Sequence, residues 1–201
     1  MTLPPPTEAR KGERTRAAIL EAAARSFRAD GFDATTLAGV ADQLGITRSA
    51  VLHHFTSKAA LLEEIVRPFF DAMDAVLDDV EAAGPFTAPS RRRFVIELVD
   101  LAAVHRNAVV VLTRDISVHP NLPDELQLTE RVQRFVAITT QANGEHPHAI
   151  ARSLAAIGAV MRPLAAPDEL VDLDDPATRA MLVNAVMAVL KLPLPVLPKQ
   201  D

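Results

Sequence analysis

The sequence predicts an all-α protein on three observations. Apolar residues recur with a helical period along most of the 201 residues. Glycine and proline interrupt this period at intervals that suit helix ends. The stretch "AVVVLT" is rich in β-branched residues, but it lies between helical patterns and has no partner strand. We expect about nine helices, arranged as a three-helix N-terminal domain and a larger helical body.

The chain begins with a charged, proline-rich arm, residues 1–13, which we expect to be disordered. A helix is predicted from Thr15, and Gly31 is its expected stop. Its buried face is formed by residues spaced three, four and seven apart: Ile19, Ala22, Ala23, Ser26 and Phe27.

Two short helices follow. Thr36 is a suitable N-cap for the first, and Gly45 ends it. Thr47 caps the second. The expected inner face of the first helix is Leu37, Val40, Ala41 and Leu44, and that of the second is Val51, Leu52 and Phe55.

Ser57 begins a long fourth helix that runs to about Ala83, before the break "AAGPFTAPS". Further helices are predicted near residues 90–106, 107–118, 123–142, 147–164 and 176–191. The tail "LPLPVLPKQD" is too rich in proline to be helical. The predicted division is an arm at 1–13, a helix-turn-helix domain at 14–58 and a body at 59–201.

Composition narrows the function. The chain has no cysteine, which excludes disulfides and thiolate metal sites. It has no apolar run long enough for a membrane span and no signal-peptide core, so a cytoplasmic location is expected. Net charge is −5, but residues 1–60 carry +2 and the remainder −7. This asymmetry is typical of a polyanion-binding head on an acidic body.

The stretch "GITRSAVLHHFTSKAALL" carries the functional signal. Two short helices joined by a tight glycine-containing turn, with a third helix before them, form the helix-turn-helix plan. The second of the two enters the major groove with its N-terminal end. There Arg48 suits a guanine edge, and Ala50 suits a thymine methyl. Thr36 and Lys58 are placed to bind phosphates.

Residues 15–66 resemble the DNA-binding domain of TetR-family transcriptional repressors. The likeness rests on the first-helix pattern, the Gly-Phe with paired threonines, the Leu-Gly-Ile-Thr turn and the His-Phe-x-Ser-Lys end. The resemblance implies a nine-helix homodimer whose first three helices bind palindromic operators. It also implies a C-terminal body that dimerises through the last two helices and holds an inducing ligand.

The candidate DNA-binding residues are Thr36, Thr47, Arg48, Ser49, Ala50, His53, His54 and Lys58. The family usually has a phosphate-binding Tyr where this chain has Leu52. We therefore expect His53 and His54 to carry more of the backbone contact. A metal ion shared by these two histidines is disfavoured, because adjacent helical residues point in different directions.

Three other charged clusters have open interpretations. Arg10, Lys11, Arg14 and Arg16 either reach the minor groove as an arm or are solvated. The triplet Arg91 to Arg93 is either a solvated face or a partner for the acidic stretch Asp78 to Glu81. Arg114 and Asp115 are expected to form a buried or interface ion pair, with a ligand-binding role as the alternative.

The last two helices, near 147–164 and 176–191, are apolar over much of their circumference. They are either core or a homodimer interface, which buries on the order of 2,000 Å² in total. The resemblance implies a pocket for a small hydrophobic ligand, uncharged or weakly anionic; ordinary core is the alternative for its walls. The candidate pocket residues are Phe69, Met73, Leu101, Leu112, His119 and Phe135.

No Gly-rich phosphate loop, nucleophile elbow or HExxH motif occurs, so we predict no enzyme, metal or cofactor. The expected function is a homodimeric, sequence-specific DNA-binding repressor that a small hydrophobic ligand releases from its operator. The alternative is a small-molecule-binding or catalytic helical protein that carries an unused helix-turn-helix head.

Overall fold

The computed structural model describes residues 6–84, 87–126, 128–141, 148–166 and 169–191. These residues form nine α-helices and two short 3-10 helices, with no strand among them, which confirms the predicted all-α class. The expected tail at 192–201 and the first five residues of the arm lie outside the described residues. The α-helices are α1 (Pro6–Ala29), α2 (Leu37–Leu44), α3 (Arg48–His54), α4 (Lys58–Ala82), α5 (Ala88–Val104), α6 (Arg106–Arg114), α7 (Leu128–Gln141), α8 (Ala149–Leu164) and α9 (Pro176–Lys191). The 3-10 helices are η1 (Ile116–Asn121) and η2 (Asp124–Leu126).

The chain divides into two compact units. The first, here called the head, lies within residues 1–70 and 107–127. The second, the body, lies within residues 71–106 and 128–201. The head therefore contains α6 and the first part of α4, whereas the sequence-based boundary at residue 58 assigned both to the body.

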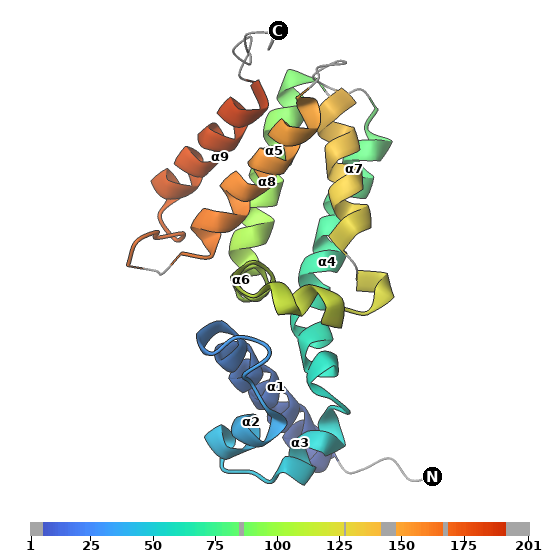
Figure 1. Ribbon diagram of the computed structural model, residues 1–201, viewed down its shortest axis with the longest axis vertical. Helices are drawn as coiled ribbons and strands as arrows, with labels where there is room; N and C mark the ends of the chain where they lie inside the picture. The colour runs from blue at the N-terminus through green and yellow to red at the C-terminus, as the bar shows by residue number, and fades with distance from the viewer. Residues whose placement is uncertain (1–5, 85–86, 127, 142–147, 167–168, 192–201) are drawn as a thin grey trace, which may run out of the picture. The chain divides into compact units, whose positions relative to one another are not determined.

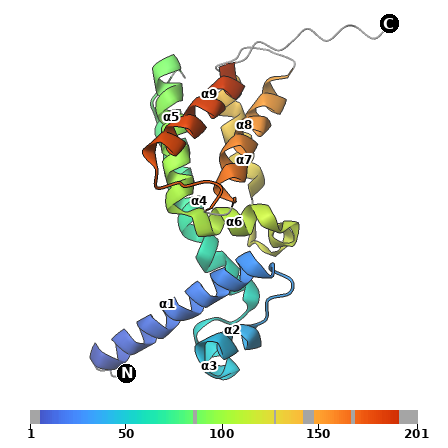
Figure 2. The same ribbon diagram turned by 90° about the vertical axis from the view of Figure 1, so that its left-hand side faces the viewer.

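The core of the head forms where α1, α2 and α3 pack together (Figures 1 and 2). Most residues of the predicted inner faces are buried there, whereas Leu37 and Leu44 are half-buried and Leu52 is exposed. Leu52 is 39% exposed, because Val51 and Phe55 occupy the inward face of α3 and Leu52 lies about 100° around the helix. The buried side chains are Ile19, Ala22, Ala23, Ser26, Phe27, Val40, Ala41, Val51 and Phe55.

Helix α1 begins at Pro6, so the expectation of disorder is wrong for residues 6–13. Proline is well tolerated in the first turn of a helix, where its missing N–H has no intrahelical acceptor. The following residues include the good helix formers Glu, Ala, Arg and Lys. The Thr15 hydroxyl also donates to the Lys11 carbonyl, 3.0 Å away. Helical propensity outweighed the charged composition on which the prediction of disorder depended.

Two predicted helix boundaries also moved. The helix expected to reach residue 118 ends at Arg114, because Asp115 has an extended backbone and its carboxylate accepts a hydrogen bond from the Ser117 amide. The helix expected from residue 123 begins only at Leu128, after the short turn η2. The connection between α6 and α7 therefore contains the two 3-10 turns, whereas the periodicity had predicted that the two helices extend into it.

In the body, α8 packs against α5, α7 and α9 (Figures 1 and 2). A buried hydroxyl pair joins α7 to α8, where Thr139 Oγ1 and Ser153 Oγ are 2.6 Å apart. No helix in the described ranges has both the length and the apolar character to cross a lipid bilayer.

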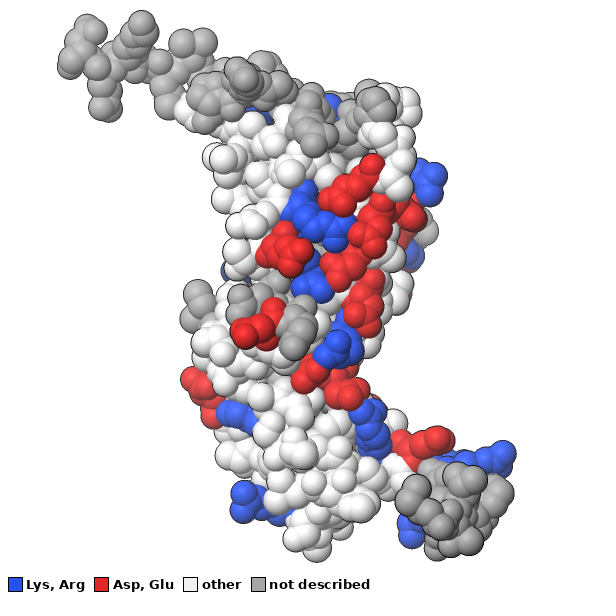
Figure 3. Space-filling model, turned by 90° about the vertical axis from the view of Figure 1, so that its right-hand side faces the viewer, with Lys and Arg blue, Asp and Glu red and all other residues white. Residues whose placement is uncertain are grey.

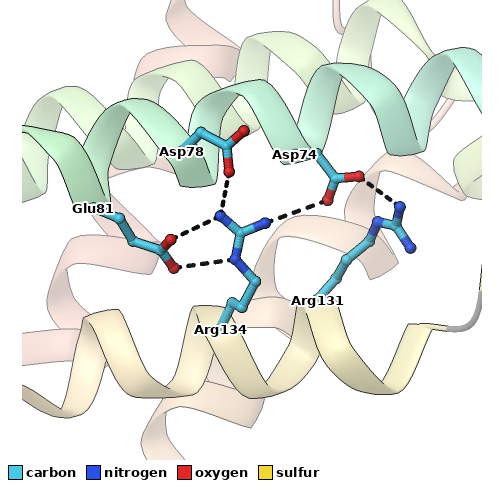
Figure 4. A network of polar contacts seen from close by, with 5 residues as sticks. All are labelled: Asp74, Asp78, Glu81, Arg131 and Arg134. Atoms are coloured by element: carbon cyan, nitrogen blue, oxygen red, sulfur yellow. Dashed lines mark hydrogen bonds and ion pairs between the residues drawn. The ribbon is translucent and has the colours of Figure 1, made fainter.

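A polar network on one side of the body connects α4 to α7 (Figure 4). The Arg134 guanidinium reaches Asp78 at 2.5 Å, Glu81 at 2.9 Å and Asp74 at 3.6 Å. Arg131 adds a 2.5 Å contact with Asp74. Figure 3 shows the interleaved positive and negative side chains on this face. Hydrogen bonding to Glu81 and Asp78 raises the pKa of Arg134, and Arg134 in turn lowers the pKa of Glu81.

This network bears on the triplet Arg91 to Arg93, for which the sequence left open a solvated face or a partner for the acidic stretch Asp78 to Glu81. Within that stretch, Asp78 and Glu81 bind Arg134. Arg93 donates to Glu97, one turn along its own helix, at 2.7 Å, and Glu97 together with the more weakly acting Asp79 raises the Arg93 pKa. An i,i+4 partner is geometrically available wherever a helix forms, so it needs no tertiary arrangement.

Candidate nucleic-acid interface

Two capped helix ends fix the turn between α2 and α3. Gly45 ends α2 in the left-handed conformation, with φ +63°, which glycine adopts without steric strain. Its N–H is bonded to the Asp42 carbonyl at 3.2 Å. The Thr47 hydroxyl then accepts a hydrogen bond from the Ala50 amide at 3.1 Å and so begins α3. A threonine cap of this kind stabilises a helix by about 1 kcal/mol.

The N-terminal end of α3 is exposed. Thr47, Arg48 and Ser49 are exposed, and Ala50 is half-buried. Val51 and Phe55, one turn apart on the opposite face, are buried in the core of the head and hold the helix in place. Among the described residues, the Arg48 side chain makes no hydrogen bond or ion pair. Its five N–H donors are therefore available to an external acceptor.

The two histidines lie at the other end of α3. Their rings meet edge to face with centroids 5.4 Å apart. His53 is exposed and His54 half-buried. Leu52, which precedes them in α3, is exposed. At the position where a phosphate-binding Tyr was noted above, this chain therefore presents an apolar side chain without a hydrogen-bond donor. The assignment of phosphate contacts to His53 and His54 stays a prediction.

Thr36 is the N-cap of α2. Its Oγ1 accepts from the Gly39 amide at 3.0 Å, and the side chain is exposed. Because the oxygen is the acceptor in this bond, the hydroxyl hydrogen remains free to donate. One residue can thus hold the start of α2 and offer a donor to a phosphate oxygen.

Lys58 has a structural role that the sequence did not reveal. Its Nζ donates to the Phe32 carbonyl at 2.6 Å and to the Asp33 carbonyl at 3.1 Å. The same Nζ lies 4.3 Å from the centroid of the Phe32 ring. An ammonium group has three donors, so two are used to hold the loop between α1 and α2. A phosphate contact by Lys58 would use the third.

The loop between α1 and α2 is held from a second side by Asp115. The Phe32 amide donates to Asp115 Oδ2 at 2.7 Å. Hydrogen bonding from Ser117 and from the Phe32 amide holds the pKa of the Asp115 carboxyl below its ordinary value. The predicted Arg114–Asp115 ion pair is therefore wrong, because the partners of this carboxylate are backbone amides and Arg114 is exposed. Gly31 is required beside it, since a Cβ there would lie 2.9 Å from Asp115 Oδ2.

The basic residues near the N-terminus divide into two groups. Arg16 belongs to the folded head, because it binds Glu64 at 2.7 Å and lies 4.9 Å from the centroid of the Phe55 ring. Arg10, Lys11 and Arg14 are exposed on the first turns of α1. An arm that reaches the minor groove would therefore start from a helix instead of a flexible segment.

The six candidate pocket residues do not share one compact unit. Phe69, Leu112 and His119 belong to the head, and Met73, Leu101 and Phe135 belong to the body. Phe69, Leu112 and Phe135 are buried, whereas His119 is exposed, with its Nε2 3.1 Å from the Leu112 carbonyl oxygen. Two surface hollows of the body, of about 380 and 290 Å³, are lined by none of the six. The pocket stays a prediction.

Comparison with known proteins places the head in a described family. Residues 19–65 match the model for bacterial regulatory proteins of the tetR family. The chain is 37% identical over 86 residues to the transcriptional repressor KstR2 of Rhodococcus jostii. The matched region covers 42% of this chain and 41% of that protein. It is 32% identical over 133 residues to the nucleoid occlusion factor SlmA of Vibrio vulnificus, covering 65% of this chain and 66% of that one. The chain spans about half the length of the KstR2 proteins that it matches.

The similarity of folds covers more of the chain. The solved structure of the ketosteroid transcriptional regulator KstR2 of Mycobacterium tuberculosis is similar with a TM-score of 0.68 at 20% identity, over 88% of this chain and 92% of that one. At this identity the likeness shows the fold alone. It places the body, as well as the head, in a known arrangement of helices.

Proposed function

Because the chain belongs, through the domain at residues 19–65, to the TetR family of bacterial regulatory proteins, we propose that it is a repressor that binds operator DNA as a homodimer. A small hydrophobic ligand releases it. Binding to chromosomal operators implies action in the cytoplasm. No catalytic step is part of this proposal.

The observation that carries the proposal is the exposed N-terminal end of α3. Its backbone is fixed by the Thr47 cap and by buried Val51 and Phe55, while Arg48 and Ser49 project without internal partners in the described structure. A side chain that reads bases needs a rigid backbone and free donors. Arg48 meets both conditions, and its fork of donors suits the O6 and N7 atoms of guanine.

The homodimer is supported by the exposed apolar side chains of α8 and α9. Ile150 is 62% exposed, Leu154 48% and Met181 56%. Ile150 and Leu154 are one helical turn apart and so share a face of α8. Large apolar side chains grouped in this way on a surface are typical of protein–protein contacts. Two heads related by a twofold axis would bind two half-sites about one helical turn of DNA apart.

The experiment that tests the proposal is selection of bound sequences from random duplex DNA by the purified protein at moderate salt. We expect an inverted repeat to be enriched, with half-sites spaced for two α3 helices in successive major grooves. A pool that stays random after repeated rounds would contradict the proposal and favour an unused head.

A further inference from the structure

One charged side chain of the body is buried with two of its nitrogens unpaired. Arg152 on α8 is only 8% exposed, and its Nε and Nη2 atoms make no hydrogen bond. Nearly all buried polar groups in native proteins have a hydrogen-bond partner. A buried guanidinium is costly unless an anion compensates its charge. The position therefore points to a group that is not part of the described chain.

The surroundings of Arg152 on its own helix are apolar and small. Ala149 and Ala156 lie one turn before and one turn after it, and both are buried with it. Val160 continues the same buried face. The neighbouring Ser153 hydroxyl is already bonded to Thr139 Oγ1 at 2.6 Å and to the Ala149 carbonyl at 3.0 Å. The Nε and Nη2 atoms of Arg152 bond to none of these residues.

The carboxylates of the body that form ion pairs in the described structure are bound to other arginines. Those on α4 bind Arg131 and Arg134, as described above. On α5, Glu97 pairs with Arg93 and Asp100 with Arg179. Helices α8 and α9 contain no Asp or Glu at all. A second copy that packs through these two helices would therefore bring no carboxylate from them to Arg152.

The place of Arg152 along α8 adds to the demand for an anion. It lies at the fourth position of the helix, and helical side chains lean toward the N-terminus. The guanidinium is thus held near the positive end of the helix dipole, where a cation is disfavoured and an anion is favoured. The N-cap residue His148 makes no side-chain hydrogen bond that would satisfy the first-turn amides.

We propose that Arg152 binds the carboxylate of an otherwise apolar small molecule, and that this acid is the ligand that controls DNA binding. A guanidinium forms two parallel hydrogen bonds with a carboxylate, which matches two unpaired nitrogens. The apolar residues around Arg152 suit the body of the ligand. The inference rests on the proposed function and narrows its ligand class to hydrophobic acids.

The test uses the full chain as wild type and as Arg152→Met, an unbranched apolar replacement. Arg162→Met, at an exposed position on the same helix, is the matched control. The probes are decanoate and 1-naphthoate, their uncharged counterparts decanol and 1-naphthol, and decyl phosphate. The readouts are the thermal unfolding midpoint and operator release.

We expect at least one of the two acids, at a hundredfold excess over its Kd, to raise the midpoint of the wild type and of Arg162→Met by roughly 5 °C or more. The matching alcohol should raise it less, and Arg152→Met should lose the shift. Without any probe, Arg152→Met should unfold at the same temperature as the wild type or higher, because a buried unpaired charge has been removed. If only decyl phosphate gave a shift that depends on Arg152, the anion site would be supported, but the ligand class would change from a carboxylate to a phosphate.

Three results would overturn the inference. The first is an equal shift in wild type and Arg152→Met, and the second is no shift with any of the three anions. The third is a clear fall in the midpoint of Arg152→Met without a probe, which would reveal an existing partner for the arginine. Operator binding distinguishes failure of the acid-binding inference from failure of the proposed function. A protein that binds the operator but does not respond to the acid still acts as a repressor.

Discussion

At the scale of single residues, Arg48 is the position where base reading is expected. Replacing it by alanine should weaken binding to the selected operator by about 1–3 kcal/mol and relax the base preference at one position in each half-site. The physical reason is the loss of a bidentate contact that no neighbouring side chain replaces. Titration of operators that vary at each position measures both effects.

The control for Arg48→Ala is Arg92→Ala, which removes an exposed arginine from α5 in the body. It should leave the base preference unchanged. An equal loss of affinity for every sequence in Arg48→Ala would mean that Arg48 binds only the DNA backbone.

Lys58 is expected to act in two ways that different measurements separate. Lys58→Met removes the hydrogen bonds to the Phe32 and Asp33 carbonyls, so urea unfolding should show a loss of about 1–3 kcal/mol. If the third donor also binds a phosphate, the slope of log affinity against log salt should fall by about 1 for each Lys58 in the complex. Unchanged stability would refute the structural role that the two carbonyl contacts indicate.

At the scale of elements, Asp115 joins η1 to the loop between α1 and α2. Its folded-state pKa is lowered, so its contribution to stability is present above the ordinary value of 3.8 and is lost as the pH falls through the folded value. Between pH 5 and pH 2.5 the free energy of unfolding of the wild type should therefore fall more steeply than that of Asp115→Asn. Parallel pH dependences in the two proteins would show that the charge of Asp115 does not stabilise the head.

The elements of the head could be predicted from the sequence because their signals are local. Thr36 and Thr47 cap helices, Gly45 ends one, and the buried faces follow from residues one turn apart. The contacts that were missed join residues far apart in the chain. Phe32 and Asp115 are 83 positions apart, and Lys58 and Phe32 are 26. Periodicity and capping rules carry no information about such pairs.

The same limit explains what was missed in the body. The sequence offered the arginine triplet as one possible partner for the acidic stretch, but it did not indicate Arg134, which lies more than 50 positions from Asp78 and Glu81. Arg152 gave no signal in the sequence, because burial of a single arginine depends on how its helix, α8, packs against others in the tertiary structure. Only a tertiary structure shows that two of its nitrogens have no partner.

At the scale of the whole molecule, DNA binding is expected to depend on pairing of two chains through α8 and α9. Leu154→Asp places a charge on the exposed apolar face of α8 and should convert a dimer into a monomer, because an unpaired charge cannot be buried cheaply at an interface. Sedimentation should show the smaller species, with helical content unchanged. Affinity for the full operator should fall toward that for one half-site.

The control is Leu170→Asp, which changes a leucine that is even more exposed, at 77%, and lies outside both helices. It should remain dimeric. A monomeric wild type, or a Leu154→Asp variant as dimeric as its control, would contradict the assignment of this surface.

The central claim is that α3 recognises a specific duplex sequence. The most direct measurement is the affinity of the wild-type protein for its selected operator compared with a duplex of the same length and scrambled sequence, both at 0.15 M salt. We predict that the selected duplex binds at least about a thousandfold more tightly. Equal affinities for the two duplexes would contradict the account.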